Sequence, residues 1–183
     1  MGNYIKKQYK NYVNNVSSSV MAISYELSTY MWKYINKQKP KYILDLGSGF
    51  SSFLFRYYKK EYNNEAVIFS VDTSKEWLLK TEEFLKENDL STKNLYTFDD
   101  FKKIPQRQFD YILYDLGSMA TRHENLKYIL QYKKDNTPCI IDDVHKLQYK
   151  NFVLETVKRL NLKYKFLTDE TYDSYGRFSM EVK

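Results

Sequence analysis

The chain has 183 residues, of which 43% are hydrophobic and 28% are charged, a balance typical of one globular domain and not of a disordered chain. Its single cysteine, Cys139, excludes an intrachain disulfide and favours a reducing compartment. No apolar run approaches the roughly 18 residues that a membrane span needs, and the N-terminus lacks the apolar region of a signal peptide. We therefore expect a cytoplasmic protein without a membrane span.

The formal net charge is +6, and it is concentrated at the N-terminus. Residues 1–41 hold seven lysines and one acidic residue, Glu26, whereas the remaining residues carry equal numbers of positive and negative side chains. Such an arm favours an anionic partner, which could be nucleic acid, a phosphorylated small molecule or a membrane surface. The alternative is a solvated, lysine-rich helix face without a partner.

Residues 13–34 repeat apolar side chains at steps of three and four, which predicts one long amphipathic helix. Pro40, which follows Lys39, ends this pattern because proline cannot continue a helix. We therefore expect an N-terminal helical lid or arm over residues 1–39 and the main domain over residues 40–183, within a single-domain protein.

Beyond the proline, strand-like runs alternate with helix-like stretches. The expected strands cover residues 42–46, 66–71, 94–98, 109–114, 139–141, 163–168 and 178–183. The expected helices cover residues 51–62, 74–90, 124–133 and 146–160. This alternation predicts a mostly parallel sheet with helices on both faces. Only about nine residues join the last two strands, too few for a parallel crossover, so we expect a seven-stranded α/β sheet with a reversed last strand.

Acidic residues stand at the ends of five of the expected strands. They are Asp45, Asp72, Asp99 with Asp100, Asp115, and Asp142 with Asp143. In an open parallel sheet, ligands bind beyond the carboxyl ends of the strands, near the point where the strand order reverses. Five acidic ends are not a requirement of the fold, so they predict a functional site at this edge of the sheet.

A glycine pair follows the first expected strand and opens the first helix after it. Gly47 and Gly49 allow a tight turn and a close approach of the backbone to a ligand. Asp72 follows at the end of the next strand, where a carboxylate accepts hydrogen bonds from a ribose diol. NAD would use the same aspartate, but Ser52 stands where a dinucleotide-binding loop has its third glycine, and Asp45 suits a cationic ligand better than a pyrophosphate.

These residues and the closing hairpin resemble the class I S-adenosylmethionine-dependent methyltransferases, which have a Rossmann-like fold. The resemblance covers about residues 40–183, and it implies that this stretch is an S-adenosylmethionine-binding catalytic domain. One departure is Ser51, which replaces the last glycine of the family loop. The cofactor-binding residues that the resemblance implies are Asp45, Gly47, Ser48, Gly49, Ser51, Asp72, Thr73, Asp99, Asp100 and Asp115. Among them, Asp72 would hold the ribose and Asp99 or Asp100 the adenine amino group, while Trp77 lines the same wall or packs in the helix core.

A second set of residues resembles the metal-dependent branch that methylates catechol and caffeoyl-coenzyme A. By that resemblance, Asp115, Asp142 and Asp143 would hold Mg²⁺ or another divalent cation that activates a hydroxyl group. The lysine base of that branch is absent, since Ser118 stands in its place. The residues that could substitute for that base are His145, Lys146, His123 and Arg122. The alternative is that Asp142 caps the next helix and that Asp143 is solvated.

The sequence therefore predicts a methyltransferase that acts on an oxygen of a small molecule. Asp115, His145 and Lys146 are the candidate catalytic residues, and the N-terminal helix is expected to cover the acceptor through Met21, Tyr25 and Trp32. One alternative is an RNA methyltransferase that binds nucleic acid through the basic arm. Its site would be completed by Lys41, Lys146 and Glu181. The other alternative is a protein that binds or consumes S-adenosylmethionine without a methyl acceptor.

Overall fold

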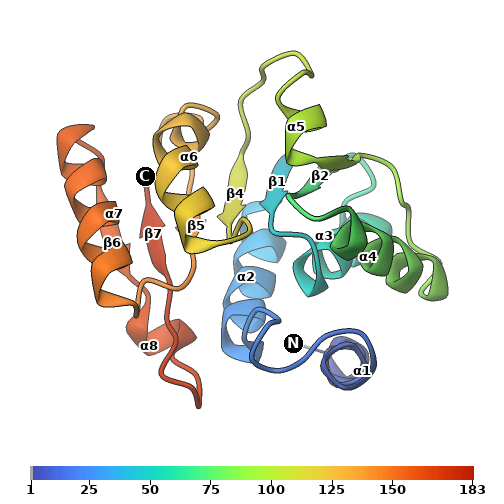
Figure 1. Cartoon of the computed structure of the whole chain (residues 1–183). Coiled ribbons are helices and arrows are strands. Elements are labelled where there is room, and N and C mark those ends of the chain that lie inside the picture. Colours follow the sequence, from blue (N-terminus) through green and yellow to red (C-terminus); the bar gives the residue numbers. More distant parts are fainter. Residues whose placement is uncertain (1) are drawn as a thin grey trace.

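The computed structural model describes residues 2–183, which form an α/β fold around one seven-stranded sheet (Figure 1). The strands are β1 (Tyr42–Leu46), β2 (Val67–Asp72), β3 (Leu95–Thr97), β4 (Tyr111–Tyr114), β5 (Cys139–Ile141), β6 (Tyr164–Phe166) and β7 (Met180–Val182). Their order in the sheet is β3-β2-β1-β4-β5-β7-β6, and β7 alone runs antiparallel to its neighbours. The expected seven-stranded sheet with a reversed last strand is confirmed.

Within residues 2–183, eight helices surround the sheet. They are α1 (Asn3–Asn15), α2 (Tyr25–Gln38), α3 (Phe50–Tyr62), α4 (Lys75–Glu87), α5 (Phe98–Phe101), α6 (Met119–Leu130), α7 (Leu147–Arg159) and α8 (Thr168–Thr171). Alternate strand residues point to opposite faces, so Ile43 packs with α1 to α4 and Leu44 packs with α5 to α7. Among residues 2–183, no helix is long and apolar enough to cross a membrane.

The N-terminal region contains two helices, so the expected single long helix is wrong. The amides of Val16 and Ser17 both bond to the carbonyl of Tyr12, which ends α1. Ser24 then starts α2, because its hydroxyl accepts a hydrogen bond from the amide of Leu27. Val20, which the apolar repeat would have buried, lies in the connection and is 61% exposed.

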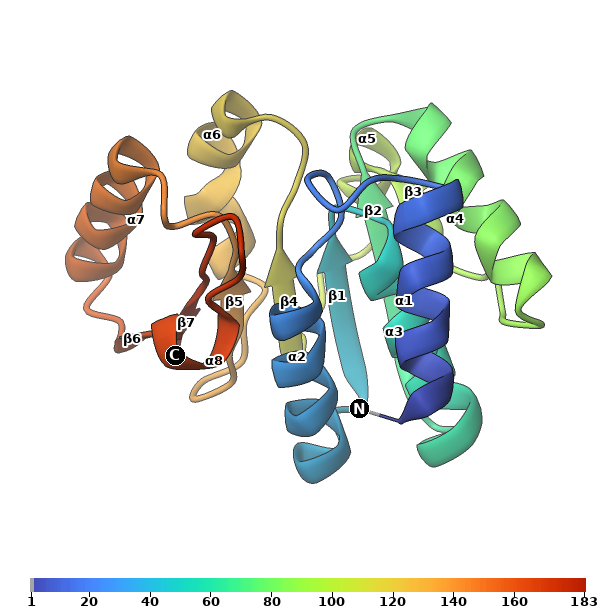
Figure 2. The same cartoon turned by 90° about the horizontal axis from the view of Figure 1, so that it is seen from below.

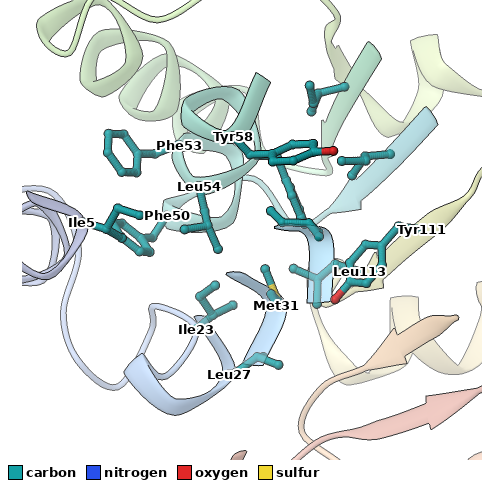
Figure 3. Packing of buried hydrophobic residues seen from close by; sticks show 14 of the residues in the cluster. Ile5, Ile23, Leu27, Met31, Phe50, Phe53, Leu54, Tyr58, Tyr111 and Leu113 are labelled. Atoms are coloured by element: carbon teal, nitrogen blue, oxygen red, sulfur yellow. The ribbon is translucent and has the colours of Figure 1, made fainter. Parts of the chain in front are cut away.

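Both N-terminal helices belong to the packed core. Figure 3 shows Ile5 of α1 beside Phe50 of α3, and Leu27 and Met31 of α2 near the sheet residue Leu113. Met31 and the next inward residue of α2, Ile35, are fully buried. Helices α1 and α2 therefore cover one face of the sheet as part of its core, and the expected lid role of residues 1–39 stays a prediction.

The last two strands pair as the expected antiparallel hairpin, with Tyr164 opposite Val182 and Phe166 opposite Met180. The sequence predicted no helix between these two strands, but the four-residue helix α8 lies in their connection. The hydroxyl of Thr171 stabilises this turn by accepting from the amide of Ser179 and donating to the carbonyl of Leu167.

Candidate functional site

The glycine loop between β1 and α3 approaches β4 so closely that only glycine fits at its first turn. Gly47 has a φ of +101°, and a Cβ at this position would lie 2.3 Å from the carbonyl oxygen of Asp115. Its amide bonds to the carbonyl of Val71 on β2, which fixes the loop to the sheet. The loop therefore lies over the carboxyl ends of the three central strands, where the strand order reverses.

Asp72, at the end of β2, organises the same loop. One of its oxygens accepts hydrogen bonds from the amide and the hydroxyl of Ser48, at 2.9 and 3.0 Å, and the other accepts from the amide of Ser74 at 2.9 Å. Burial raises the pKa of Asp72, while the hydrogen bonds from Ser74 and Ser48 favour the ionised form. A carboxylate has about four acceptor positions, so this arrangement leaves one for a ligand.

Asp45 lies beneath the loop and does not contact a cavity. It is fully buried, and its Oδ2 accepts hydrogen bonds from the hydroxyls of Ser52, at 2.5 Å, and Ser70, at 2.8 Å. Arg56 in turn donates to Ser70 at 2.7 Å. Asp45 therefore does not line the first cavity and supports the loop from below, and its expected role toward a ligand stays a prediction.

A first cavity opens above the loop, between β1, β2, β4 and the N-terminal connection. Of the predicted residues, it is lined by Gly47, Ser48, Gly49, Ser51, Asp72, Asp115 and Trp77. Tyr12 and Ile23 also line it, although no sequence motif marked them as site residues. Tyr12 contacts the loop so closely that a Cβ at Gly49 would lie 2.9 Å from its hydroxyl. Because the residue lies on α1, outside the expected main domain, only a contact across the fold could have revealed it.

Besides Asp45, three further residues predicted to bind the cofactor lie outside this cavity. Asp99 and Asp100 are exposed on α5, where they pair with Lys102 and Lys103. Asp100 is also the last member of a capping motif, because Thr97 accepts from its amide and donates to its carboxylate. The structure therefore gives these two aspartates a helix-capping and surface role.

Thr73 is likewise exposed. Its hydroxyl lies against Gly117, where an added Cβ would approach to 2.7 Å, so it supports the neighbouring turn.

A second cavity of about 450 Å³ adjoins the first and contains the expected metal ligands Asp115, Asp142 and Asp143. A guanidinium lies between two of them: Arg122 is 2.5 Å from Asp115 and 3.1 Å from Asp143. Asp142 is turned toward Ser179, whose hydroxyl donates to it at 2.7 Å. Within residues 2–183, no three histidine, cysteine or acidic side chains are placed to hold a metal ion, so these residues do not fit the expected divalent cation.

Burial works to raise the pKa of all three carboxyl groups. The pKa values of Asp115 and Asp142 are raised, because burial outweighs the opposing charge of Arg122. For Asp143 the hydrogen bond from Lys146 and the charge of Arg122 outweigh burial and hold the pKa below its ordinary value. Arg122 is itself buried, yet the surrounding carboxylates raise its pKa. The guanidinium of Arg122 therefore stays positively charged.

Two of the other predicted catalytic residues gather around Asp143. Lys146 lies 2.6 Å from its carboxylate, and Nδ1 of His145 lies 3.6 Å from it. This ring nitrogen is buried without a hydrogen-bond partner among the described residues. His123 instead bonds to the carbonyl of Met119, on the side of α6 that packs against Tyr149.

The residues of the RNA-methylating alternative do not come together. Lys41 precedes β1 at the amino end of the sheet and pairs with Glu65. Glu181 lies on β7, where it bonds to Tyr30 and Lys183. Lys146 follows β5 and pairs with Asp143, so the three residues have separate partners and do not form the expected constellation.

The rim of both cavities is the connection at residues 16–24, which passes near the carboxyl end of β1 (Figure 2). Met21 is 64% exposed and lines both cavities, as expected of a lid residue. Trp32 instead packs against Tyr57 and Tyr62 on α3, so its expected role at the ligand is wrong. Tyr25 packs against Tyr9 of α1 and lines neither cavity.

Arg177, from the connection before β7, fastens this rim. It donates to the carbonyls of Ser19, Val20 and Ala22 at 2.8 to 3.1 Å, while Asp173 holds its Nε at 2.7 Å. Hydrogen bonds from a charged donor contribute roughly 1.5–3 kcal/mol each. Arg177 therefore holds three backbone carbonyls of the rim in place.

We expect Arg177→Ala to loosen the rim without unfolding the sheet. The amide of Ala22, which bonds to Ser18, should then exchange with deuterium at least tenfold faster, as measured by hydrogen-exchange mass spectrometry. Arg159→Ala is the matched control, because Arg159 pairs with Glu155 on the exposed face of α7. Equal exchange at Ala22 in all three proteins would contradict the assigned role of Arg177.

The sequence matches no protein-family model and no curated protein, but the fold matches many solved structures. A methyltransferase of Podospora anserina with bound S-adenosylhomocysteine is 14% identical, with a TM-score of 0.76 over 99% of this chain and 88% of that one. An O-methyltransferase of Bacillus cereus with the same ligand is 12% identical, with a TM-score of 0.74 over 100% and 90%.

A Staphylococcus aureus protein assigned by inference to the caffeoyl-coenzyme A O-methyltransferases is also 12% identical, with a TM-score of 0.74 over 100% and 93%. At identities this low, the similarity shows a shared fold. The chain thus has the Rossmann-like fold of S-adenosylmethionine-dependent methyltransferases, and the predicted resemblance is confirmed at that level.

Proposed function

We propose that the protein is an S-adenosylmethionine-dependent methyltransferase that methylates an oxygen of a small molecule. The observation that carries this proposal is the first cavity, where Gly47 brings the backbone against the end of β4 while Asp72 stands beside it. The structural neighbours that contain S-adenosylhomocysteine, in Podospora anserina and Bacillus cereus, support the same cofactor.

The lining of the first cavity suits the parts of this cofactor. Asp72 has an acceptor position left for a ribose hydroxyl, and the hydroxyl of Ser48, which donates to Asp72, itself accepts from Thr81 at 3.2 Å. Trp77 offers an aromatic surface to the adenine. Asp115, at the boundary of the two cavities, offers its carboxyl group to a polar or cationic part of the ligand.

When bound, S-adenosylmethionine supplies an electrophilic methyl group on a sulfonium ion. The protein's task is then to bring an acceptor oxygen into line with it, since positioning contributes most of the acceleration in such a displacement. With cofactor and acceptor bound, His145, next to Asp143, would accept the proton of the acceptor hydroxyl. Lys146 holds Asp143 in place during this step.

The second cavity favours a small acceptor over a polymer. Its volume of about 450 Å³ lies within the usual range for small-molecule sites. The rim at Met21 and the side chains of Tyr175 and Arg177 close it on the side away from the sheet. Its lining contains acidic and basic groups in similar number, unlike the uniformly basic groove that a nucleic-acid backbone requires.

The test is cofactor binding by Asp72→Ala. We expect the wild type to bind S-adenosylmethionine and S-adenosylhomocysteine but not NAD in isothermal titration calorimetry, and the variant to bind both at least tenfold more weakly. The physical reason is that a ribose hydroxyl loses a charged acceptor, which is worth roughly 1.5–3 kcal/mol.

Asp99→Ala is the matched control, because Asp99 is exposed and pairs only with Lys102. It should bind within threefold of the wild type. Thermal unfolding of each variant separates a lost contact from a lost fold. A wild type that fails to bind S-adenosylmethionine would overturn the proposed function, and binding without transfer to any hydroxylated acceptor would favour the cofactor-binding alternative.

A further inference from the structure

The polar atoms around Arg122 form a shell made entirely of oxygen. Its guanidinium contacts a carboxylate oxygen of Asp115 and one of Asp143, at 2.5 and 3.1 Å. It also donates to three consecutive backbone carbonyls, those of Asp115, Leu116 and Gly117, at 3.3 to 3.4 Å. Five oxygen atoms from the ends of β4 and β5 thus converge on one organic cation.

We propose that Arg122 is a built-in replacement for a divalent cation at this site, and that the protein works without a metal there. Oxygen shells that combine carboxylates with backbone carbonyls are the usual environment of hard divalent ions. Here the guanidinium already neutralises Asp115 and Asp143, and a divalent ion placed among the same oxygens would lie within a few ångströms of a fixed positive charge.

The local fold explains why the arginine reaches this position. The hydroxyl of Ser118 accepts from the amide of Thr121, which starts α6 immediately after β4. Gly117 makes the turn before it with a φ of +54°. Arg122 therefore lies on the first turn of α6, from which its side chain returns over the carbonyls at the end of β4.

The same position makes Arg122 available to an acceptor. Its side chain is only 8% exposed, yet it lines both the first and the second cavity. Its Nη1 carries two hydrogens, and Asp143 is the acceptor that the described residues provide for that nitrogen. A donor at the boundary of the cavities is placed to hold an oxygen of the acceptor, the role that a metal would otherwise have. This role rests on the proposed function, whereas the replacement of the metal does not.

The proposal predicts that removal of Arg122 turns the shell into a metal site. We would titrate Mn²⁺ into the wild type, Arg122→Met and Arg122→Lys, and follow free Mn²⁺ by electron paramagnetic resonance. Arg122→Met keeps the side-chain volume without the charge, so it should bind one Mn²⁺ at least tenfold more tightly than the wild type. Arg122→Lys keeps the charge and should resemble the wild type.

Two further measurements make the test decisive. Asp143→Asn in the Arg122→Met background should abolish the gained binding, and Mn²⁺ should raise the melting temperature of Arg122→Met but not of that double variant. The measurement on the wild type does not depend on whether any Arg122 variant folds. One Mn²⁺ bound per wild-type chain, and lost in Asp143→Asn, would overturn the proposal.

An Arg122→Met protein that folds and gains no Mn²⁺ affinity would also overturn it. Neither result requires cofactor or acceptor, so failure of this inference is distinguishable from failure of the proposed methyltransferase activity.

Discussion

Gly47→Ala should abolish cofactor binding and lower the stability of the fold. A side chain at this position meets two separate obstacles. The backbone φ of +101° is strained for any residue with a Cβ, and that Cβ would lie 2.3 Å from the carbonyl oxygen of Asp115. Neither partner is free to move, because the amide of Gly47 bonds to Val71 and the amide of Asp115 bonds to Leu46 at 2.7 Å.

The alanine variant can therefore fold only if the loop moves away from β4, which widens the first cavity and removes its backbone lining. We expect affinity for S-adenosylhomocysteine to fall at least a hundredfold in calorimetry, and the free energy of unfolding to fall by about 2–4 kcal/mol in urea.

The matched control is Gly176→Ala. Gly176 has a φ of +77°, but a Cβ there would meet nothing closer than 3.6 Å. Gly176→Ala should therefore lose only the stability that the strained backbone costs, and it should keep the wild-type affinity for S-adenosylhomocysteine. If both alanine variants bound equally well, the close approach of the glycine loop to β4 would not be what shapes the cofactor site.

The parts of the fold that the sequence predicted are those in which a local pattern determines the structure. Each buried strand is a short apolar run, and its residues divide alternately between the two helical layers, as Ile43 and Leu44 do. The turn at Gly47 requires glycine for a local reason, and Asp72 and Asp115 follow directly from the ends of their strands. These features were visible in the sequence because chain order alone brings them to one edge of the sheet.

The errors arose where a contact between distant segments, or a cap, decides the outcome. The apolar repeat continues through residues 13–34, but Ser24 provides an N-cap that starts a new helix within it. Asp100 is a capping partner of Thr97, a signal that was present in the sequence and was not used.

Arg122 was recognised only as a substitute base, because the expected helix began at residue 124. The capping hydroxyl of Ser118 starts that helix five residues earlier, at Met119, and so places the arginine among the strand-end carboxylates. The sequence showed three carboxylates in need of a cation, but only the fold showed which group provides it.

The other large effect is expected from the buried charges beneath the glycine loop. Arg56 is 3% exposed, and it donates to the carbonyls of Ser52 and Lys93 and to the hydroxyl of Ser70. That hydroxyl in turn donates to Asp45, which is fully buried. Burial lowers the pKa of Arg56 to about 10, so it remains charged at neutral pH, and its charge is among the influences that favour ionised Asp45.

Arg56→Met should therefore leave the carboxylate of Asp45 buried without a nearby cation, at a cost of about 3–5 kcal/mol near pH 8. The loss should depend on pH in a definite direction. Burial already raises the pKa of Asp45 in the folded protein, and removal of Arg56 raises it further. The folded state then binds a proton that the unfolded state releases at pH values above about 4, so the stability of the variant should rise as the pH falls.

Urea unfolding at pH 8 and pH 5 measures this directly, since a substantial part of the loss at pH 8 should be recovered at pH 5. The double variant Arg56→Met/Asp45→Asn is the control, because an amide in place of the carboxylate carries no charge and should remove the extra pH dependence. A loss of the same size at both pH values would mean that Arg56 contributes through its hydrogen bonds to Ser52 and Lys93 and not through its charge. In that case Asp45 would keep one protonation state between pH 5 and pH 8, and its titration would not contribute to the stability of the variant.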